Sequence, residues 1–253
     1  SRLRARREGE AFRTCAGITA PSQDVLTRTL AHYGDTGKPA RVIYNPMPPA
    51  EANDFATLGA GARDLLFVGR FDLHKGGDIV IEAFRRIAAQ DPEARLTFAG
   101  PDDGVARPDG SMFHITEALA ALPDAVRARI DYRGKLGKAE IADLRRSHGI
   151  ALVASRYETF CYTAVEAMTH GMATVATAAG ALPEIVRDME TGLLVPPEDP
   201  DAMAEACLRL IRDPGLAADL GARAHADVAE RFAPAPIARQ TEAFIREVQA
   251  ARA

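Results

Sequence analysis

The sequence has no tryptophan, few aromatic residues and only three cysteines. The 253 residues include 6% Phe, Trp and Tyr, and the cysteines Cys15, Cys161 and Cys207 stand far apart. An odd number of widely spaced cysteines argues against a disulfide framework and against a zinc site. Because free thiols suit a reducing compartment, we expect a cytoplasmic protein.

Excess positive charge and long apolar runs are also missing. The formal net charge is −4 and the sequence pI is about 5.9, so no general attraction to nucleic acid or anionic lipid is expected. The chain has no run of about 18 apolar residues and no apolar signal segment at its start. We therefore expect no nucleic-acid partner and no transmembrane segment, while a peripheral position at a membrane stays compatible with the sequence.

Short apolar runs alternate with amphipathic stretches from Asp64 onward. The runs are "DLLFVG", "RLTFAG", "RIDYRG", "IALVAS", "ATVATA" and "GLLV". This alternation predicts an α/β fold with a Rossmann-like parallel sheet and helices on both faces. The first helix is expected in "DIVIEAFRRIAAQ", with Asp78 as its N-cap, and three more over 199–212, 214–231 and 235–250.

The first 46 residues predict only small pieces of structure. "GITAPS" and "ARVIYNP" are expected to be short strands, with a helix capped by Ser22 between them. Pieces of this size cannot form a core alone. "NPMPPAEAN" and "GAGA" are typical of a linker. The interpretation divides the chain into the last elements of an N-terminal domain (1–46), an interdomain linker (47–62), a sheet domain (63–232) and a C-terminal helix (233–253) expected to cross back to the first part.

Ligands of open parallel sheets bind beyond the carboxyl ends of the strands. After the first run, "GRFDLHKGGD" places Arg70 and Lys75 on one glycine-containing loop before a helix. Two cations, free N–H groups and a helix N-terminus can converge there on an anion such as a pyrophosphate. A solvated basic loop is the alternative interpretation, and the P-loop pattern is absent.

Two glutamates follow the fourth run, in "SRYETFCYTAVEAM". Glu158 is expected in the strand-to-helix loop near the reacting group of a ligand, and Glu166 about one turn into the helix. A carboxylate at the second position can accept hydrogen bonds from two adjacent ribose hydroxyls. Because Ala164, Val165 and Met168 surround Glu166, an unpaired carboxylate would be costly, which favours a ligand partner over a solvated helix face. Gly180 marks either a second close approach to a ligand or a structural turn.

Together, G-R-x-x-x-x-K-G, E-x-x-x-x-x-x-x-E and "TGLLVPPEDPDAMAEA" closely resemble the family 4 retaining glycosyltransferases of GT-B fold, from about Arg41 to Phe244. The resemblance implies transfer of a hexose from a nucleoside diphosphate sugar, UDP- or GDP-linked, to a glycan, lipid-linked or small-molecule acceptor. It also implies retained anomeric configuration and no metal or other cofactor. The N-terminal acceptor domain of that family would be largely missing, so this chain alone is expected to be inactive or weakly active.

Roles for single residues come from the same resemblance. Arg70 and Lys75 would neutralise the donor diphosphate, Glu158 would face the donor sugar, and Glu166 would hold the ribose. The first three form the expected catalytic set. The remaining expected donor-binding residues lie on the neighbouring loops and are Gly69, Gly100, Lys135, Leu136, Thr159, Phe160, Cys161, Tyr162 and Thr163.

One departure and several alternatives stand beside this interpretation. Many family members have glycine where this chain has Cys161, so the sugar pocket is expected to be narrower or shifted, and the donor sugar is not fixed. A nucleophilic cysteine is disfavoured because no histidine is placed nearby in the sequence. "DPD" at 199–201 is interpreted as a helix N-cap rather than a metal motif. The other functions considered are a non-catalytic nucleotide-sugar-binding or interaction module, and a GT-B sugar phosphorylase or epimerase.

Overall fold

The computed structural model describes residues 2–49 and 63–251, with side chains from residue 7 onward. It confirms the predicted α/β fold: a six-stranded sheet with the order β11-β10-β9-β3-β5-β8, in which every pairing is parallel. The strands are β3 (Asp64–Val68), β5 (Arg95–Ala99), β8 (Ile130–Gly134), β9 (Ile150–Val153), β10 (Ala173–Thr177) and β11 (Leu193–Val195). Each of the six apolar runs of the sequence forms one of these strands.

The order of the strands creates a switch point between β3 and β9. From β3 the chain builds β5 and β8 to one side, and it then returns to place β9 on the other side of β3. Leu65 pairs with Ile150 and Phe67 with Leu152, so the two strands end next to each other. Ligands of this architecture bind where the loops after such a pair diverge.

Helices cover both faces of the sheet. Leu65 and Phe67 of β3 pack into one core with α3 (Gly77–Gln90) and α9 (Pro200–Arg212), whereas Leu66 faces a second cluster with Ala167. That second face carries α6 (Lys138–Ser147) and α7 (Tyr162–Thr169), while α10 (Pro214–Arg231) packs on α7 and also contributes Ala217 and Leu220 to the first core. Successive residues of β3 thus point to opposite faces that are both covered by helices, which explains why this short strand is apolar throughout.

Two predictions about local structure need correction. The N-cap of α3 is Gly76, with a left-handed φ of 67°, and Asp78 lies inside the first turn as a partner of Arg156. The stretches after β3 and after β5, both expected to be loops, form a small sheet of β4 (Phe71–Asp72), β6 (Asp102–Ala106) and β7 (Met112–Phe113). Two short helices were not predicted, α4 (Ile115–Ala120) and α5 (Asp124–Arg127), whereas α8 (Leu182–Ile185) lies where "AAGALPEIV" indicates a helix start.

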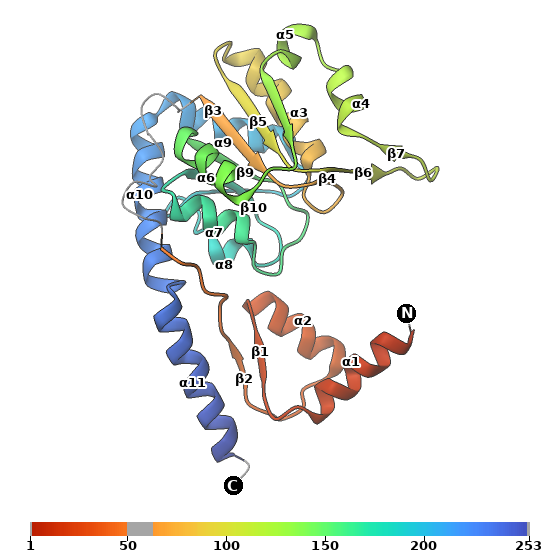
Figure 1. Ribbon diagram of the computed structural model, residues 1–253, viewed down its shortest axis with the longest axis vertical. Coiled ribbons are helices and arrows are strands. Elements are labelled where there is room, and N and C mark those ends of the chain that lie inside the picture. Colours follow the sequence, from red (N-terminus) through yellow and green to blue (C-terminus); the bar gives the residue numbers. More distant parts are fainter. Residues whose placement is uncertain (1, 50–62, 252–253) are drawn as a thin grey trace.

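The N-terminal segment forms a small unit of its own, lying below the sheet domain in Figure 1. It contains α1 (Arg2–Thr14), β1 (Ile18–Ala20), α2 (Gln23–Tyr33) and β2 (Ala40–Val42). Ser22 caps α2 as predicted, accepting a 3.3 Å hydrogen bond from the Val25 amide. Helix α1 was not predicted; its Phe12 stacks on Tyr33 with ring centroids 5.0 Å apart.

Helix α11 (Pro234–Ala250) runs beside β2 in Figure 1. Ile237 and Phe244 form a buried cluster with Ile43, and Arg41 pairs with Glu247 at 2.6 Å. Most of the predicted linker, 50–62, lies outside the described residues. Met47, at its start, is buried, and its amide donates to the Phe232 carbonyl at 2.7 Å. Among the described helices, none has the length and apolarity needed to cross a membrane.

Candidate functional site

Asp72 organises the loop that follows β3. Its carboxylate is buried and accepts a 2.7 Å hydrogen bond from the Lys75 amide through one oxygen, while Arg70 Nη2 lies 2.7 Å from the other oxygen. Arg70 also reaches Asp103 at 3.4 Å and keeps about half of its side chain exposed, at 49%. The loop is therefore folded around the Asp72 carboxylate, which fixes the backbone of Lys75 and the side chain of Arg70.

Lys75 and Glu158 meet across the switch point. Lys75 Nζ lies 2.5 Å from Oε1 of Glu158, and the same oxygen accepts a 2.7 Å hydrogen bond from Ser155 Oγ. The Glu158 side chain is only 10% exposed. Residues that are 83 positions apart in the sequence thus share one narrow pocket, whose lining includes Phe67, Lys75, Ser155, Glu158, Cys161 and Thr163.

Glycines let the loops of this pocket touch backbone to backbone. A Cβ on Gly76 would stand 2.1 Å from the Ala154 carbonyl oxygen, and one on Gly180 would stand 2.2 Å from the Glu158 carbonyl oxygen. Both glycines have left-handed φ angles, 67° and 58°. The Ala181 amide donates to that same Glu158 oxygen at 2.9 Å. Gly180 therefore makes a close approach to the loop of Glu158, one of the two roles that the sequence left open.

Sequence reasoning did not single out Arg156, which anchors the loop that carries Glu158. Its guanidinium binds both carboxylate oxygens of Asp78, at 3.1 and 2.8 Å, and Glu198 at 2.8 Å. These carboxylates raise the pKa of Arg156 against the opposing effect of burial. A signal in the sequence could have identified Arg156: it lies two residues before Glu158, on a loop at the carboxyl end of a strand.

Glu166 is paired within the chain, so its carboxylate does not require the ligand partner that the sequence favoured. It forms an ion pair with Arg145 of α6, and its side chain is 38% exposed while that of Arg145 is 7% exposed. Burial lowers the pKa of the Arg145 guanidinium, and the charge of Glu166 partly offsets that effect. The apolar neighbours of Glu166 in the sequence had predicted burial. Its carboxylate instead lies at the partly exposed edge of α7, where it binds Arg145 of α6.

Cys161 occupies a strained backbone position beside Glu158. Its φ is 74°, in the left-handed region that favours glycine, and it stands at the N-cap of α7. Burial, with the nearby charge of Glu158, raises the pKa of this thiol to about 12. A thiol that stays protonated at neutral pH is a poor nucleophile, so its chemistry here is that of a small apolar side chain.

The remaining predicted donor-binding residues differ in what they present. Phe160 is buried and packs on Phe232, with ring centroids 5.7 Å apart, so only its backbone can face the pocket. Thr159, Tyr162 and Lys135 are exposed, while Thr163 and Leu136 are partly exposed. Gly100 joins the loops after β3 and β8: its Cβ would stand 1.8 Å from the Gly69 carbonyl oxygen, and its amide donates to Gly134 at 2.7 Å.

Carboxylates elsewhere do not form a metal cluster in the part of the chain that the structure describes. Asp199 is the N-cap of α9 and accepts a 2.9 Å hydrogen bond from the Ala202 amide. This confirms the interpretation of "DPD" as a helix start. The arrangement of charge is instead two cations on a glycine-rich loop facing a carboxylate, which suits an anionic ligand with a hydroxylated group attached.

Comparison with known proteins supports the fold and shows the family. The family described as "Glycosyl transferases group 1" matches residues 51–227. A D-inositol 3-phosphate glycosyltransferase from Streptomyces bingchenggensis is 34% identical over 230 residues, covering 85% of this chain and 49% of that protein. One from Rhodococcus jostii is 32% identical over 227 residues, covering 85% of this chain and 48% of that protein. The chain thus spans about half the length of these curated relatives.

Solved structures show the same architecture. Sucrose-phosphate synthase from Thermosynechococcus elongatus superimposes with a TM-score of 0.76 at 28% identity, covering 99% of this chain and 63% of that one. The Anabaena protein HepE, solved in complex with UDP and glucose, gives 0.80 at 21% identity, covering 98% of this chain and 68% of that one. The second likeness is one of fold alone.

Proposed function

The chain belongs to the group 1 family of glycosyl transferases, and from this premise we propose that it is the donor-binding part of a retaining, family 4 enzyme. Its reaction would transfer a hexose from a nucleoside diphosphate sugar to an acceptor. The observation that carries the proposal is the meeting of Lys75 and Glu158 at the switch point between β3 and β9. A UDP-linked donor is the first choice, because HepE, of the same fold, binds UDP and UDP-glucose.

In this proposal the cations act on the diphosphate. Arg70 and Lys75 lie on one loop at the N-terminal end of α3, where N–H groups also favour an anion. As the bond between the sugar and the diphosphate oxygen breaks, its electron pair stays on the diphosphate, and the two cations stabilise the added charge. The acceptor hydroxyl then attacks the oxocarbenium-like sugar carbon from the same face, and its proton passes to the departing diphosphate oxygen.

The two glutamates have unequal roles. Glu158, nearly buried beside Lys75, would orient sugar hydroxyls rather than form a covalent bond to the sugar, as the nucleophile of a retaining glycoside hydrolase does. Glu166, at the partly exposed edge of α7, would accept hydrogen bonds from the ribose. Its pairing with Arg145 holds the carboxylate in place and keeps one oxygen engaged, so the second oxygen is the one available to the nucleotide.

We propose that residues 63–232 bind the donor, that 1–46 and 233–253 belong to the acceptor half, and that full activity needs the complete acceptor domain. The reaction would need no metal or other cofactor, because the cations of the β3 loop supply the charge. We propose that the enzyme is cytoplasmic, and that it is peripheral at a membrane if its acceptor is lipid-linked.

Calorimetry with UDP, UDP-glucose, GDP-mannose and ADP-glucose tests the proposal. We expect the folded chain to bind one nucleotide series, and Arg70→Ala and Lys75→Met each to weaken that binding by about 10- to 100-fold, the worth of a charged hydrogen bond. Glu166→Gln is preferred to Glu166→Ala, since alanine would leave Arg145 buried and unpaired. The control is Arg127→Ala, which removes another arginine with a local carboxylate partner, Asp124.

A folded protein that binds none of these compounds would favour the non-catalytic interaction module. Donor binding without transfer by the full-length protein would favour a nucleotide-sugar-binding module. Release of a sugar phosphate, or interconversion of epimers, would favour the phosphorylase or epimerase.

A further inference from the structure

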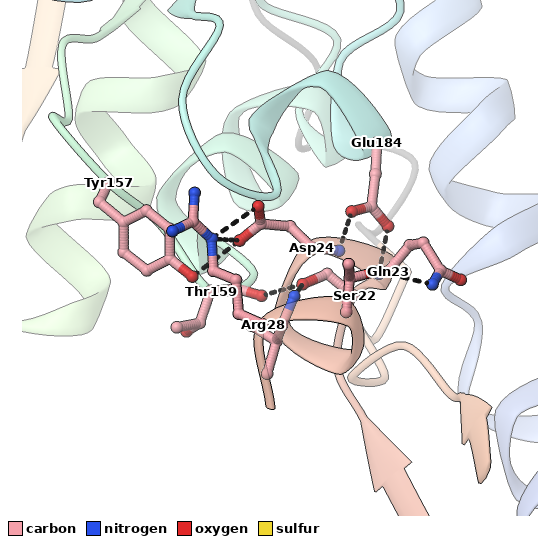
Figure 2. A network of polar contacts seen from close by, with 9 residues as sticks. Ser22, Gln23, Asp24, Arg28, Tyr157, Thr159 and Glu184 are labelled. Atoms are coloured by element: carbon pink, nitrogen blue, oxygen red, sulfur yellow. Dashed lines mark hydrogen bonds and ion pairs between the residues drawn. The ribbon is translucent and has the colours of Figure 1, made fainter. Parts of the chain in front are cut away.

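The first turn of α2 lies against the loop that carries Glu158, as Figure 2 shows. The buried hydroxyl of Ser22 donates to the Thr159 carbonyl at 2.9 Å, and the Tyr157 hydroxyl donates to Asp24 at 2.7 Å. The residues immediately before and after Glu158 are therefore both bonded to one turn of the N-terminal segment. These contacts join residues 137 and 133 positions apart.

Glu184 of α8 holds the same turn from the other side. Its two carboxylate oxygens accept hydrogen bonds from the backbone amides of Gln23 and Asp24, at 2.7 and 2.9 Å. Amides in the first turn of a helix have no partner inside the helix, and a carboxylate there also complements the helix dipole. Arg28 completes the contact by binding Asp24 at 3.0 Å and lying 5.1 Å from the centre of the Tyr157 ring.

The two contacts act on the same short piece of backbone. Glu184 follows Gly180 and Ala181, which touch the Glu158 carbonyl directly. The Glu158 side chain faces the other way, toward Lys75 and Ser155. The turn of α2 does not touch the pocket, yet it is bonded to the residues on both sides of the one carboxylate that the pocket contains among its described lining residues.

We propose that the turn Ser22–Asp24, Tyr157 and Glu184, together called the brace, position the Glu158 loop for the donor sugar. Ser22, Asp24, Tyr157 and Glu184 are positioning residues. They act through the backbone of Glu158, so the brace determines how well the pocket distinguishes a nucleotide sugar from the bare nucleotide. The preference for the sugar rests on the proposed function, whereas the ordering of the loop does not.

Hydrogen exchange tests the ordering of the loop without any ligand. Tyr157→Phe removes one hydroxyl and keeps the ring, and Glu184→Ala removes the carboxylate beneath α2. We expect amides in 155–161 to exchange about tenfold faster in each variant, the effect of losing roughly one charged hydrogen bond. The controls are Tyr33→Phe, whose hydroxyl has no hydrogen bond among the described residues, and Glu205→Ala on the exposed side of α9. Unchanged exchange in both brace variants overturns the proposal.

Calorimetry with UDP and UDP-glucose tests the effect on the pocket. In the brace variants, the ratio of the two affinities should move about tenfold toward UDP while the affinity for UDP itself stays the same. Glu184→Gln, which keeps an acceptor oxygen, should restore part of that ratio; a merely structural role would lower both affinities together.

The two failures can be told apart. If the wild-type chain binds neither compound, the proposed function fails and hydrogen exchange alone decides on the brace. If the wild type prefers UDP-glucose and the brace variants keep that preference, the brace fails and the proposed function stands.

Discussion

Lys75 on the loop after β3 and Glu158 on the loop after β9 form an ion pair 2.5 Å long, mostly shielded from solvent. The pair bridges the loops that follow β3 and β9, two neighbouring strands of the described sheet from which the chain continues to opposite sides. A diphosphate entering there would compete with Glu158 for Lys75.

Replacing Glu158 separates the two parts of the proposed donor. In Glu158→Ala, Lys75 loses its competing anion, so the affinity for UDP should rise about threefold to tenfold at low salt. The extra affinity that the sugar adds should disappear, because in the proposed complex Glu158 would face the sugar. Calorimetry with UDP and UDP-glucose at two salt concentrations measures both effects, and Glu82→Ala on the exposed side of α3 is the control. Weaker UDP binding in Glu158→Ala would contradict this assignment.

Gly76 should be far less replaceable than another left-handed glycine. Gly76→Ala and Gly110→Ala both place alanine at positive φ, which costs about 1–2 kcal/mol. A Cβ at Gly110 meets nothing within 4 Å, whereas at Gly76 it would collide with the Ala154 carbonyl. We expect Gly76→Ala to lose about 1–3 kcal/mol more, the usual range for overpacking. Urea unfolding measures the difference, and equal losses in the two variants would show that the loops carrying Gly76 and Ala154 can move apart.

His148 should make stability fall in mild acid. Its Nδ1 lies 2.7 Å from the Leu144 carbonyl and its Nε2 2.8 Å from Thr97 Oγ1, so the neutral ring donates to the first and accepts from the second. Burial lowers the pKa of His148, against the opposing effects of the Leu144 carbonyl and of the charges on Asp64 and Asp131.

The sign follows from proton uptake. Below the unfolded pKa of about 6.5, the unfolded chain takes up a proton that the folded chain resists, so stability falls as the pH decreases toward the folded pKa. Above about 6.5 this histidine contributes no pH dependence. Urea unfolding at pH 7.5 and 5.5 should show the loss in the wild type and a smaller one in His148→Gln. Identical losses in the two proteins would rule out His148 as the source.

The three thiols should react with iodoacetamide in a fixed order. Cys15 is partly exposed, while Cys161 and Cys207 are buried and burial raises the pKa of each thiol. At pH 8 in the native protein, we expect Cys15 to be modified at least about tenfold faster than the others, because the thiolate is the reacting form and needs access. Mass spectrometry of tryptic peptides gives the rates, and urea-unfolded protein supplies the control. Fast native labelling of Cys161 would revive the nucleophile that the sequence disfavoured.

The strands and most helices were predictable because their signals are local. "DLLFVG" and "IALVAS" are apolar on both faces, as buried parallel strands must be, and Pro214 and Asp199 mark helix starts. The helix start at Asp78 was wrong because a good capping residue stood near the right place, while Arg156, 78 positions away, claimed its carboxylate. Helix α1 escaped because it lacks an apolar stripe apart from Phe12 and its neighbours.

The sequence predicted which residues lie at the site better than it predicted which of them pair with each other. Placing Lys75 and Glu158 at the ends of two strands needed only the strand order. The pairing of Glu166 with Arg145 was not visible, since it depends on how α6 and α7 lie against each other. The brace was equally hidden, because Ser22 looks like an ordinary helix cap until its hydroxyl is seen to donate to Thr159 as well.

The contact between Arg41 and Glu247 sets a constraint on biosynthesis. Its partners are 206 positions apart, and Ile43 is covered by Ile237 and Phe244 of the same last helix. Contacts this distant in sequence form late, so during translation Ile43 gains its cover only after α11 has left the ribosome. Until then Ile43 is open to chaperones or to other nascent chains, so truncation within α11 should reduce the yield of folded protein before it affects the pocket.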